Sequence, residues 1–372
     1  MVEKMVITPW EVKGSVDYER LIKEFGLKAM PSLPKQFDHV LFRRSIIFAH
    51  RDFERIVEAV EKKKHFVMMT GLMPSGKFHF GHKMVAEQMI FYQKLGAKLY
   101  VAVADIEAFN SRIPNMAELH QTAVEEYLLN YIALGLEPKN CDFYFQSKRS
   151  KEGKKSNAYY SLANMLARNA TFNEFKAVYG DISPGKMTAS LLQAADMLHP
   201  QLPEFEGGAL PVVVPVGVDQ DPHLRLARDI SQRTEAFKFL QLSSTYHMFQ
   251  PGLKGGKMSS SDPLSFIALT DSPEEAERKI KKYAFSGGRE TVEEHRAKGG
   301  NPDVDVSFQM LRYGLEPDDK KLAQIYDDYK SGKLLTSELK QIAIEKVSEF
   351  LAHHQVEREK ARSKLDKFLW KD

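Results

Sequence analysis

The 372-residue chain contains a single cysteine, Cys141. One cysteine excludes an intrachain disulfide and any metal site built from a cluster of cysteines. We expect the lone thiol to act as a small buried hydrophobic side chain rather than as a nucleophile. The chain also has no apolar run near the roughly 18 residues that a membrane span requires. Association with a membrane is therefore not expected.

A strong excess of one charge sign is missing as well. Lysine and arginine total 53 against 50 aspartates and glutamates, which leaves a net charge of +3. This balance neither requires nor excludes nucleic acid, because basic residues can be confined to one face. Glu3, Glu11, Asp17 and Glu19 interrupt the basic residues of the N-terminus and argue against a signal or transit peptide. A cytoplasmic protein is the expectation.

What the chain does contain is alternating strand and helix patterns over its first two thirds. Residues 66–70 form an apolar run that ends at Gly71, as in a buried parallel strand. Residues 83–95 read as a helix and residues 98–104 as a second strand, so this stretch predicts a βαβ unit. Further elements follow from the same patterns: a helix at 51–64, strands at 142–146 and 211–218, and helices at 118–134 and 188–198.

Beyond Pro273 only helical patterns appear. The sequence therefore predicts an α/β protein with a parallel sheet, followed by an all-α region. These helices are expected at 274–283, 317–329 and 336–370, the last with a break near His353. The predicted division is an N-terminal extension packed on the main domain (1–62), an α/β domain (63–262) and a helical C-terminal domain (263–372).

The turn between the first strand and its helix carries two histidines three residues apart, His79 and His82. Glycines at 76 and 81 allow a ligand to approach the backbone closely. A helix that begins here offers unpaired N–H groups to phosphate, and the imidazoles add donors for charge that develops on a phosphoryl group. The loop is not a Walker loop, because the required Lys-Ser/Thr pair is absent. A tight structural corner would also explain this motif taken alone.

A second motif, Lys257-Met258-Ser259-Ser260-Ser261-Asp262, follows Gly255 and Gly256. Glycines before a lysine predict a loop that can carry a point charge toward a ligand. A solvated surface loop is the alternative reading. The two motifs together say more than either alone, because they occur in this order about 175 residues apart, with the first inside the βαβ unit.

In this respect the chain resembles the class I aminoacyl-tRNA synthetases, whose signatures are His-Ile-Gly-His and Lys-Met-Ser-Lys-Ser. The resemblance implies a Rossmann-like sheet and two motifs that hold ATP. Met69-Thr70-Gly71, with the turn at 74–77, is similar to the tyrosyl and tryptophanyl subgroup. Residues 215–225 are similar to the Asp-Gln-Asp-Pro segment of tryptophanyl enzymes, and residues 284–308 resemble the archaeal and eukaryotic tryptophanyl branch in particular. The similarity spans roughly residues 40–370.

The resemblance also implies substrates and partners. These are L-tryptophan, ATP with Mg²⁺ bound to it, and tRNA(Trp), whose anticodon the C-terminal helices would read. No metal held by the protein is implied, and the family assembles as homodimers.

Individual roles follow from the family motifs. His79 and His82 would donate to phosphate oxygens, Lys257 would compensate the leaving phosphates, and Ser259, Ser260 and Ser261 would shape the loop; these six form the implied catalytic set. The implied ATP-binding residues are Gly71, Pro74, Gly81, Gly217, Asp219 and Met258. The implied amino-acid-binding residues are Met69, Glu107, Gln193, Asp196 and Gln220, with Glu107 at the substrate ammonium.

Two departures bear on substrate choice. Eukaryotic tryptophanyl enzymes carry a tyrosine and a glutamine that reach the indole nitrogen, where this chain has Met69 and Ala102. Asp196 resembles the acid that tyrosyl enzymes direct at the phenol, yet their accompanying tyrosine is Ala189 here. A tyrosyl-tRNA synthetase and a synthetase-like RNA- or metabolite-binding protein without ligation activity remain alternatives. A nucleotidylyltransferase would need neither the second motif nor the C-terminal helices.

Overall fold

A seven-stranded sheet forms the centre of the computed structural model, which describes residues 6–7, 12–13, 17–111, 113–256, 258 and 262–369. The strand order is β3-β4-β9-β8-β5-β6-β7. The run from β9 to β7 is parallel, whereas β4 and β3 are added antiparallel at one edge. The strands are β3 (Lys28–Ala29), β4 (Ile47–Arg51), β5 (Val67–Leu72), β6 (Lys98–Val103), β7 (Cys141–Phe145), β8 (Val212–Gly217) and β9 (Ser243–His247). The predicted α/β class and the predicted parallel strands β5 to β8 are confirmed.

The sequence did not predict β3, β4 or β9. Strand β9 reads Ser-Ser-Thr-Tyr-His, and all five residues are buried although most are polar. Such a strand has no apolar run to reveal it. Strand β4 precedes the boundary predicted after residue 62, yet it pairs with β9; the domain division itself stays a prediction. A separate two-stranded sheet pairs β1 (Val6–Ile7) with β2 (Val12–Lys13).

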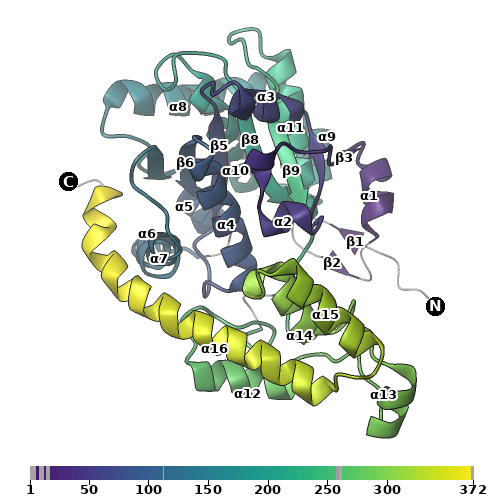
Figure 1. The fold of residues 1–372 in the computed structure, drawn as a ribbon. Coiled ribbons are helices and arrows are strands. Elements are labelled where there is room, and N and C mark those ends of the chain that lie inside the picture. Colours follow the sequence, from purple (N-terminus) through teal and green to yellow (C-terminus); the bar gives the residue numbers. More distant parts are fainter. Residues whose placement is uncertain are drawn as a thin grey trace.

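Helices cover both faces of the sheet (Figure 1). Alternate residues of one strand point to opposite faces, so Met68 and Val101 join a core with α3, α4 and α7. Met69 and Ala102 join a second core with α8, α10 and α11. The helices up to this point are α1 (Tyr18–Glu24), α2 (Val40–Arg43), α3 (Glu54–Glu61), α4 (Phe80–Lys94), α5 (Asp105–Ser111), α6 (Met116–Thr122), α7 (Leu129–Ala133), α8 (Gly153–Leu166), α9 (Phe172–Tyr179), α10 (Pro184–Leu198) and α11 (Asp221–Arg233), with a π-helical segment, Ala123–Leu128, joining α6 to α7.

The C-terminal helices form a layer below the sheet in the view of Figure 1. They are α12 (Pro273–Tyr283), α13 (Val292–Lys298), α14 (Val306–Met310), α15 (Asp319–Lys330) and α16 (Thr336–Ala361), followed by a 3₁₀ segment, Arg362–Lys367. The break predicted near His353 was wrong. Helix α16 continues because His354 is bound to Asn130 of α7 (Nε2 to Oδ1, 2.7 Å) and Leu351 is buried beside it.

One hydrophobic core joins this layer to the sheet. Val347 and Leu351 of α16 belong to the same cluster as Met68 and Val101 of the sheet. The ring of Phe80, the first residue of α4, lies 5.4 Å from the ring of Phe350. Helix α4 is thus held between the sheet and α16.

Cys141 is partly buried and packs against this core, as expected of a small hydrophobic residue. Burial raises the pKa of its thiol to about 12, so the thiol stays protonated at neutral pH.

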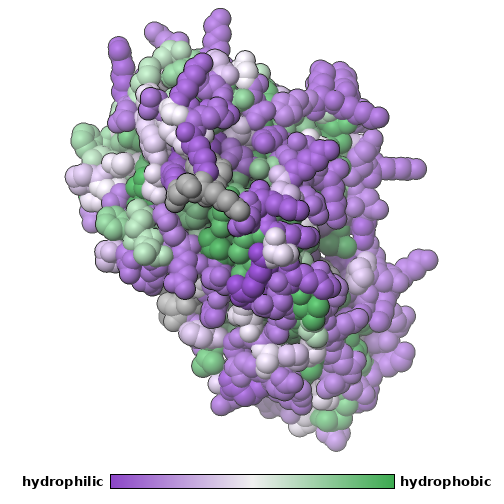
Figure 2. All heavy atoms as spheres, turned by 90° about the vertical axis from the view of Figure 1, so that its left-hand side faces the viewer, coloured by the Kyte–Doolittle hydropathy of each residue, from purple (hydrophilic) through white to green (hydrophobic). Residues whose placement is uncertain are grey.

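Side chains on the face shown in Figure 2 are mostly hydrophilic, with apolar residues gathered near its middle. Among the described residues, none of the helices has the length and apolar character needed to cross a membrane.

Candidate active site

The carboxyl ends of β5, β6 and β8 open into a cavity of about 470 Å³. Ligands of parallel α/β sheets usually bind at this edge. Twelve of the seventeen predicted site residues line the cavity: Met69, Gly71, His79, Gly81, His82, Glu107, Gln193, Asp196, Gly217, Asp219, Gln220 and Met258. Pro74 is buried in the preceding turn and does not line it. Lys257, Ser259, Ser260 and Ser261 lie outside the described residues.

The two histidines cap the start of α4. The Gly81 N–H donates to His79 Nδ1 (3.1 Å), and the His79 N–H donates to His82 Nδ1 (3.3 Å). Because each Nδ1 accepts a hydrogen bond, each neutral ring carries its proton on Nε2. The rings stack with centroids 3.8 Å apart, and both line the cavity. The histidines therefore present two N–H donors beside a helix N-terminus.

Both imidazoles are neutral at physiological pH. Burial lowers the pKa of His79 to about 4 and lowers that of His82 well below 6.5. The neighbouring His79 lowers the pKa of His82 further. Neutral rings can lie in close contact without repulsion, so they supply directed hydrogen bonds rather than charge.

The second motif meets the first at this corner. A Cβ placed on Gly81 would lie 3.5 Å from the sulfur of Met258. Beyond the motif, the Leu269 N–H donates to the Phe78 carbonyl (2.8 Å). The ring of Phe266 lies 5.0 Å from that of His79. Residues about 175 positions apart in sequence thus border one cavity. Gly81 leaves the space that Met258 and a ligand can share.

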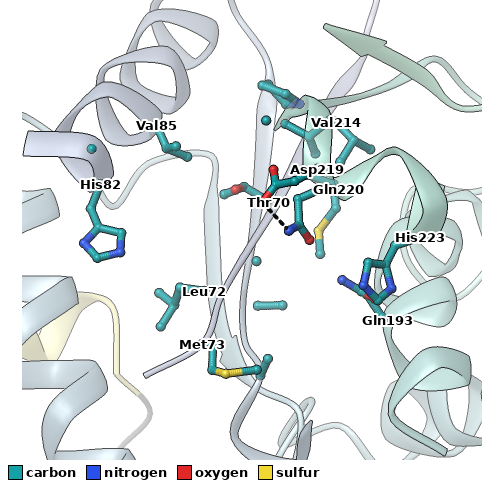
Figure 3. A pocket seen from close by; sticks show the side chains of 18 of the residues that line it. Thr70, Leu72, Met73, His82, Val85, Gln193, Val214, Asp219, Gln220 and His223 are labelled. Carbon is teal, nitrogen blue, oxygen red and sulfur yellow. Dashed lines mark hydrogen bonds between the residues drawn. The ribbon is translucent and has the colours of Figure 1, made fainter. Parts of the chain in front are cut away.

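Asp219 and Gln220, in the short 3₁₀ turn Val218–Gln220 that follows β8, lie beside Thr70 of β5 in Figure 3. Gln220 Nε2 donates to Asp219 Oδ2 (3.2 Å). A Cβ at Gly217 would lie 2.7 Å from Asp219 Oδ1 and 3.1 Å from the ring of Phe249. Gly217 is therefore required sterically, because any larger residue would displace Asp219.

A buried carboxylate, Asp196, lies in the wall of the cavity. It accepts hydrogen bonds from the hydroxyls of Tyr144 (2.7 Å) and Tyr159 (2.8 Å) at Oδ1, and from Gln146 Nε2 (2.7 Å) at Oδ2. Burial raises the pKa of Asp196 to about 6 although the three donors oppose this. Behind it, the buried guanidinium of Arg149 lies 3.9 Å from the ring of Tyr144. The carboxylate is ionised at neutral pH and held in one orientation.

Glu107 and Gln193 lie on α5 and α10, beside Asp196. The backbone N–H of Glu107 donates to Gln146 Oε1 (3.4 Å). Gln146 therefore bonds both to the Glu107 backbone and to the Asp196 carboxylate. Gln193 Oε1 is buried with no hydrogen-bond partner among the described residues. An acceptor in this position suits a cationic donor on a ligand. In Figure 3 Gln193 lies beside His223 on the side of the cavity opposite His82.

Sequence reasoning did not find four residues that build this subsite. Gln146 directly follows β7, and that place at a strand's carboxyl end was a usable signal. His223 stands in the first turn of α11 and lines the cavity. Tyr144 and Tyr159 gave no signal, because a tyrosine in an apolar strand or helix is usually a core residue. Among the described residues no group of three or more His, Cys, Asp or Glu could hold a metal ion.

Acid is expected to destabilise the fold between pH 6.5 and about 4. Burial lowers the pKa of His79, His223 and His354 to about 4, against about 6.5 for an exposed histidine. In this window the unfolded chain takes up protons that the folded chain does not. The free energy of unfolding therefore decreases as the pH is lowered, by up to about 1.4 kcal/mol per pH unit for each histidine.

The raised pKa of Asp196, about 6, acts in the opposite direction below pH 6. Asp196 is one group and the histidines are three, so the free energy of unfolding still decreases toward acid pH. Urea unfolding midpoints recorded from about pH 7 to about pH 5 test this expectation. A midpoint that is constant or rises toward low pH would contradict it.

Comparison with known proteins places this site in a family. The model of the family described as tRNA synthetases class I (W and Y) matches residues 61–352. A tryptophan–tRNA ligase of Aeropyrum pernix is 48% identical over 364 residues, 96% of each chain. One of Methanocaldococcus jannaschii is 44% identical over 98% of each chain. The crystal structure of the tryptophanyl-tRNA synthetase of Aeropyrum pernix K1 superposes with a TM-score of 0.86 at 47% identity, covering 93% of this chain and 94% of that one. The chain belongs to the class I tRNA synthetases of the tryptophan and tyrosine type.

Proposed function

We propose that the chain is a tryptophan–tRNA ligase. It activates L-tryptophan with ATP to tryptophanyl-adenylate and pyrophosphate, and then transfers the aminoacyl group to the 3′-terminal adenosine of tRNA(Trp). The observation that carries the proposal is the meeting of the two signature motifs at one cavity, where Met258 lies beside Gly81 and the paired imidazoles. Identity to ligases of this name over nearly the whole chain supports it.

The first step needs no nucleophile from the protein, because the tryptophan carboxylate attacks the α-phosphorus of ATP. His79 and His82 donate from Nε2 to phosphate oxygens as charge builds up, which suits the neutral tautomers fixed by their Nδ1 contacts. Lys257 compensates the leaving phosphates, and Ser259, Ser260 and Ser261 shape its loop. Mg²⁺ arrives with ATP, whose phosphate oxygens are its usual ligands.

The adenosine lies against the glycine positions and the end of β8. Gly71 and Gly81 allow the nucleotide close to the backbone, Pro74 holds the preceding turn, and Asp219 accepts from a ribose hydroxyl. Gly217 keeps Asp219 in place, since a side chain there would collide with its carboxylate. Met258 covers the nucleotide from the second motif.

At the amino-acid end, Glu107 and Gln193 Oε1, which has no partner among the described residues, accept from the substrate ammonium, and Gln220 orients its carboxylate. Met69 packs against the indole ring. Asp196 accepts from the indole N–H, which replaces the tyrosine and glutamine that this chain lacks at positions 69 and 102.

The hydrogen bonds of Asp196 favour tryptophan over tyrosine. Indole offers only a donor, and Asp196 can accept one more. A phenol hydroxyl also needs a donor for its own oxygen. The hydroxyls of Tyr144 and Tyr159 already donate to Asp196, so neither can also donate to the phenol oxygen of a bound tyrosine. A site built around unmatched polar groups discriminates strongly.

The remaining parts of the proposal rest on the family resemblance. The helices of residues 263–372 bind the anticodon region of the tRNA, the active species is a homodimer, and the enzyme works in the cytoplasm. Light scattering of the purified protein tests the dimer directly.

Exchange of labelled pyrophosphate into ATP tests the function, with tryptophan, tyrosine and phenylalanine assayed in parallel. Exchange with tryptophan alone is the expected result. Exchange with tyrosine would favour the tyrosyl alternative. No exchange, with or without added tRNA, would favour a binding protein without ligation activity.

A further inference from the structure

A buried arginine, Arg149, lies behind the cavity wall that carries Asp196. It stands four residues after the end of β7, and it is only 1% exposed. The proposed reaction makes no use of it. A buried ion pair is a poor means of stabilising a core, because replacing it by apolar residues of similar volume is often neutral or stabilising. The charge of Arg149 is therefore better explained by a function.

Two side chains fix the position of the guanidinium. Arg149 Nη2 donates to Asp142 Oδ2 (3.0 Å), and Arg149 Nε donates to His199 Nε2 (3.0 Å). His199 Nδ1 lies 2.9 Å from the Ala195 carbonyl. A carbonyl only accepts, so Nδ1 carries the proton of the neutral ring and Nε2 is an acceptor. Burial lowers the pKa of His199 well below 6.5, and the Arg149 charge lowers it further, so the ring stays neutral.

The guanidinium also lies over aromatic rings. Its carbon is 3.9 Å from the ring centroid of Tyr144, 4.7 Å from that of Phe205 and 5.4 Å from that of Tyr100. Aromatic rings attract a cation at such distances, most strongly where water is excluded. The hydroxyl of Tyr144 donates to Asp196 Oδ1. One phenol ring thus joins the Arg149 charge to the Asp196 carboxylate.

His199 contacts both tyrosines that bind this carboxylate. Its ring meets those of Tyr144 and Tyr159 edge to face, with centroids 5.6 Å and 5.2 Å apart. Burial raises the pKa of both tyrosine hydroxyls well above 10, so both remain donors to Asp196. Arg149 and His199 together therefore position two of the three donors that Asp196 has among the described residues.

The charge of Asp196 depends on the groups packed around it. Those that titrate are Tyr144 (β7), Tyr159 and Tyr160 (α8), His199 (after α10), Glu107 (α5) and His223 (α11). The tyrosines and histidines are uncharged near neutral pH, because burial raises the pKa of the former and lowers that of the latter. Burial also raises the pKa of Asp196, whereas the charge of Arg149 favours the ionised carboxylate. Asp142 opposes Arg149 only in part, since its side chain is 24% exposed and screened by water.

The charge state of Asp196 decides which substrate side chain it can bind. An ionised carboxylate only accepts, which suits an indole N–H. A protonated carboxyl also donates an O–H, and so supplies the donor that the phenol oxygen of tyrosine needs. A group that keeps Asp196 ionised therefore favours tryptophan over tyrosine.

We propose that Arg149 is a specificity-determining positioning residue, which acts through Tyr144 and His199 to hold Asp196 as a charged acceptor for the indole N–H. The inference rests on the proposed function and adds to it a residue that does not line the cavity.

Three variants of the full-length enzyme test the proposal. Arg149→Met removes the charge but keeps a flexible side chain that can fill the space. Arg149→Lys keeps a charge without the planar fork. Arg44→Met is the matched control, because the Arg44 side chain is also buried (7% exposed) but binds Asp319 and carbonyls of the C-terminal helices, away from the cavity. Glu107 and Asp142 are retained throughout, so their charges are common to all three.

Two quantities are measured in pyrophosphate exchange: the KM for tryptophan as a function of pH, and the ratio of kcat/KM for tryptophan to that for tyrosine. In the unaltered enzyme the KM should rise as the pH falls through about 6. Loss of a unit charge on the order of 8 Å away, at an effective dielectric constant of about 20, should move this midpoint up by about one pH unit or more.

For Arg149→Met we therefore expect the KM for tryptophan to rise already near neutral pH, where the preference for tryptophan over tyrosine should fall about tenfold, the equivalent of one pKa unit. Arg149→Lys should keep the midpoint but raise the KM at every pH, because a point charge cannot hold Asp142, His199 and Tyr144 together. A midpoint that is unmoved in Arg149→Met, or that moves equally in Arg44→Met, would overturn the proposal. A KM independent of pH in the unaltered enzyme would overturn it as well. Absence of tryptophan-dependent exchange in the unaltered enzyme would instead contradict the proposed function itself.

Ionic strength provides a test in the unaltered enzyme if Arg149→Met does not fold. Arg149 and Asp196 are both buried, and salt screens buried charges much less than exposed ones. The pH midpoint of the KM should therefore stay constant, to within about 0.3 pH units, when the salt concentration is raised about tenfold. A larger movement would show that exposed charges control Asp196, and would overturn the proposal.

Discussion

Replacing His79 by alanine is expected to slow adenylate formation by about 10²–10³-fold, the usual cost of removing one donor to a developing oxyanion. Tryptophan binding should change little, because in the proposed arrangement His79 binds the phosphates whereas Asp196, Glu107 and Gln193 bind the amino acid. Pre-steady-state adenylate formation and equilibrium binding of tryptophan measure the two quantities separately. Equal loss of both would contradict the assigned role.

The same substitution removes a helix cap, and this effect must be kept apart from catalysis. His79 Nδ1 accepts from the Gly81 N–H at the start of α4, and loss of a cap costs about 0.5–2 kcal/mol. His79→Asn keeps an oxygen that can cap the helix, but its N–H₂ group reaches less far than the imidazole Nε2–H. The variant should therefore retain most of the stability and lose most of the rate of adenylate formation. His65→Ala is the matched control, since His65 is exposed and bound only to Glu206 in the described structure.

Asp196→Asn is expected to raise the KM for tryptophan by about tenfold to a hundredfold, because an amide N–H₂ would face the indole N–H. The amide would also face Gln146 Nε2, which now donates to Asp196 Oδ2. Rotating the Gln146 amide would relieve this clash but break its bond from the Glu107 N–H. Stability should therefore fall by about 1–3 kcal/mol as well.

Asp305→Asn separates these two effects. Asp305 is fully buried and accepts from Gly287, Ser307 and Tyr329 in the C-terminal helices, away from the cavity. It should lose stability without a change in KM. In the unaltered enzyme the KM for tryptophan should rise as pH falls through about 6, where Asp196 takes up a proton. A KM for tryptophan that is constant across this pH range and is unchanged in Asp196→Asn would contradict a role of Asp196 in indole recognition.

Local patterns were enough to predict four of the five parallel strands, β5 to β8, and to find both signature motifs. Strands β5, β6 and β8 are apolar runs next to glycine, and the His-x-Gly-His turn follows one of them directly. Such signals lie within a few consecutive residues. Strand β9 was missed because its buried residues are mostly polar, and several of them bind groups outside the sheet: Ser243 binds the Asp52 carbonyl, Tyr246 binds Asp221 and His247 binds Gln88.

The amino-acid end of the site could be predicted only in part. Asp196 was named from its resemblance to an acid of the tyrosyl enzymes and Gln193 for its polar chemistry, and both line the cavity. The three donors to Asp196 come from β7, the residue after it, and α8, and no short pattern connects these segments. The role proposed for Asp196 would account for the departure at Met69 and Ala102, and it depends on these three donors holding one carboxylate.

The hydrophobic core shared by the sheet and α16 has a consequence for how the protein opens. Because Val347 and Leu351 belong to the same cluster as Met68 and Val101, separating the C-terminal helices from the sheet would expose apolar surface on both. Partial opening along that seam is therefore costly, and the two regions should lose structure as one cooperative unit. The slowest-exchanging amides are then expected in α16 as well as in β5 and β6, although α16 lies at the end of the chain.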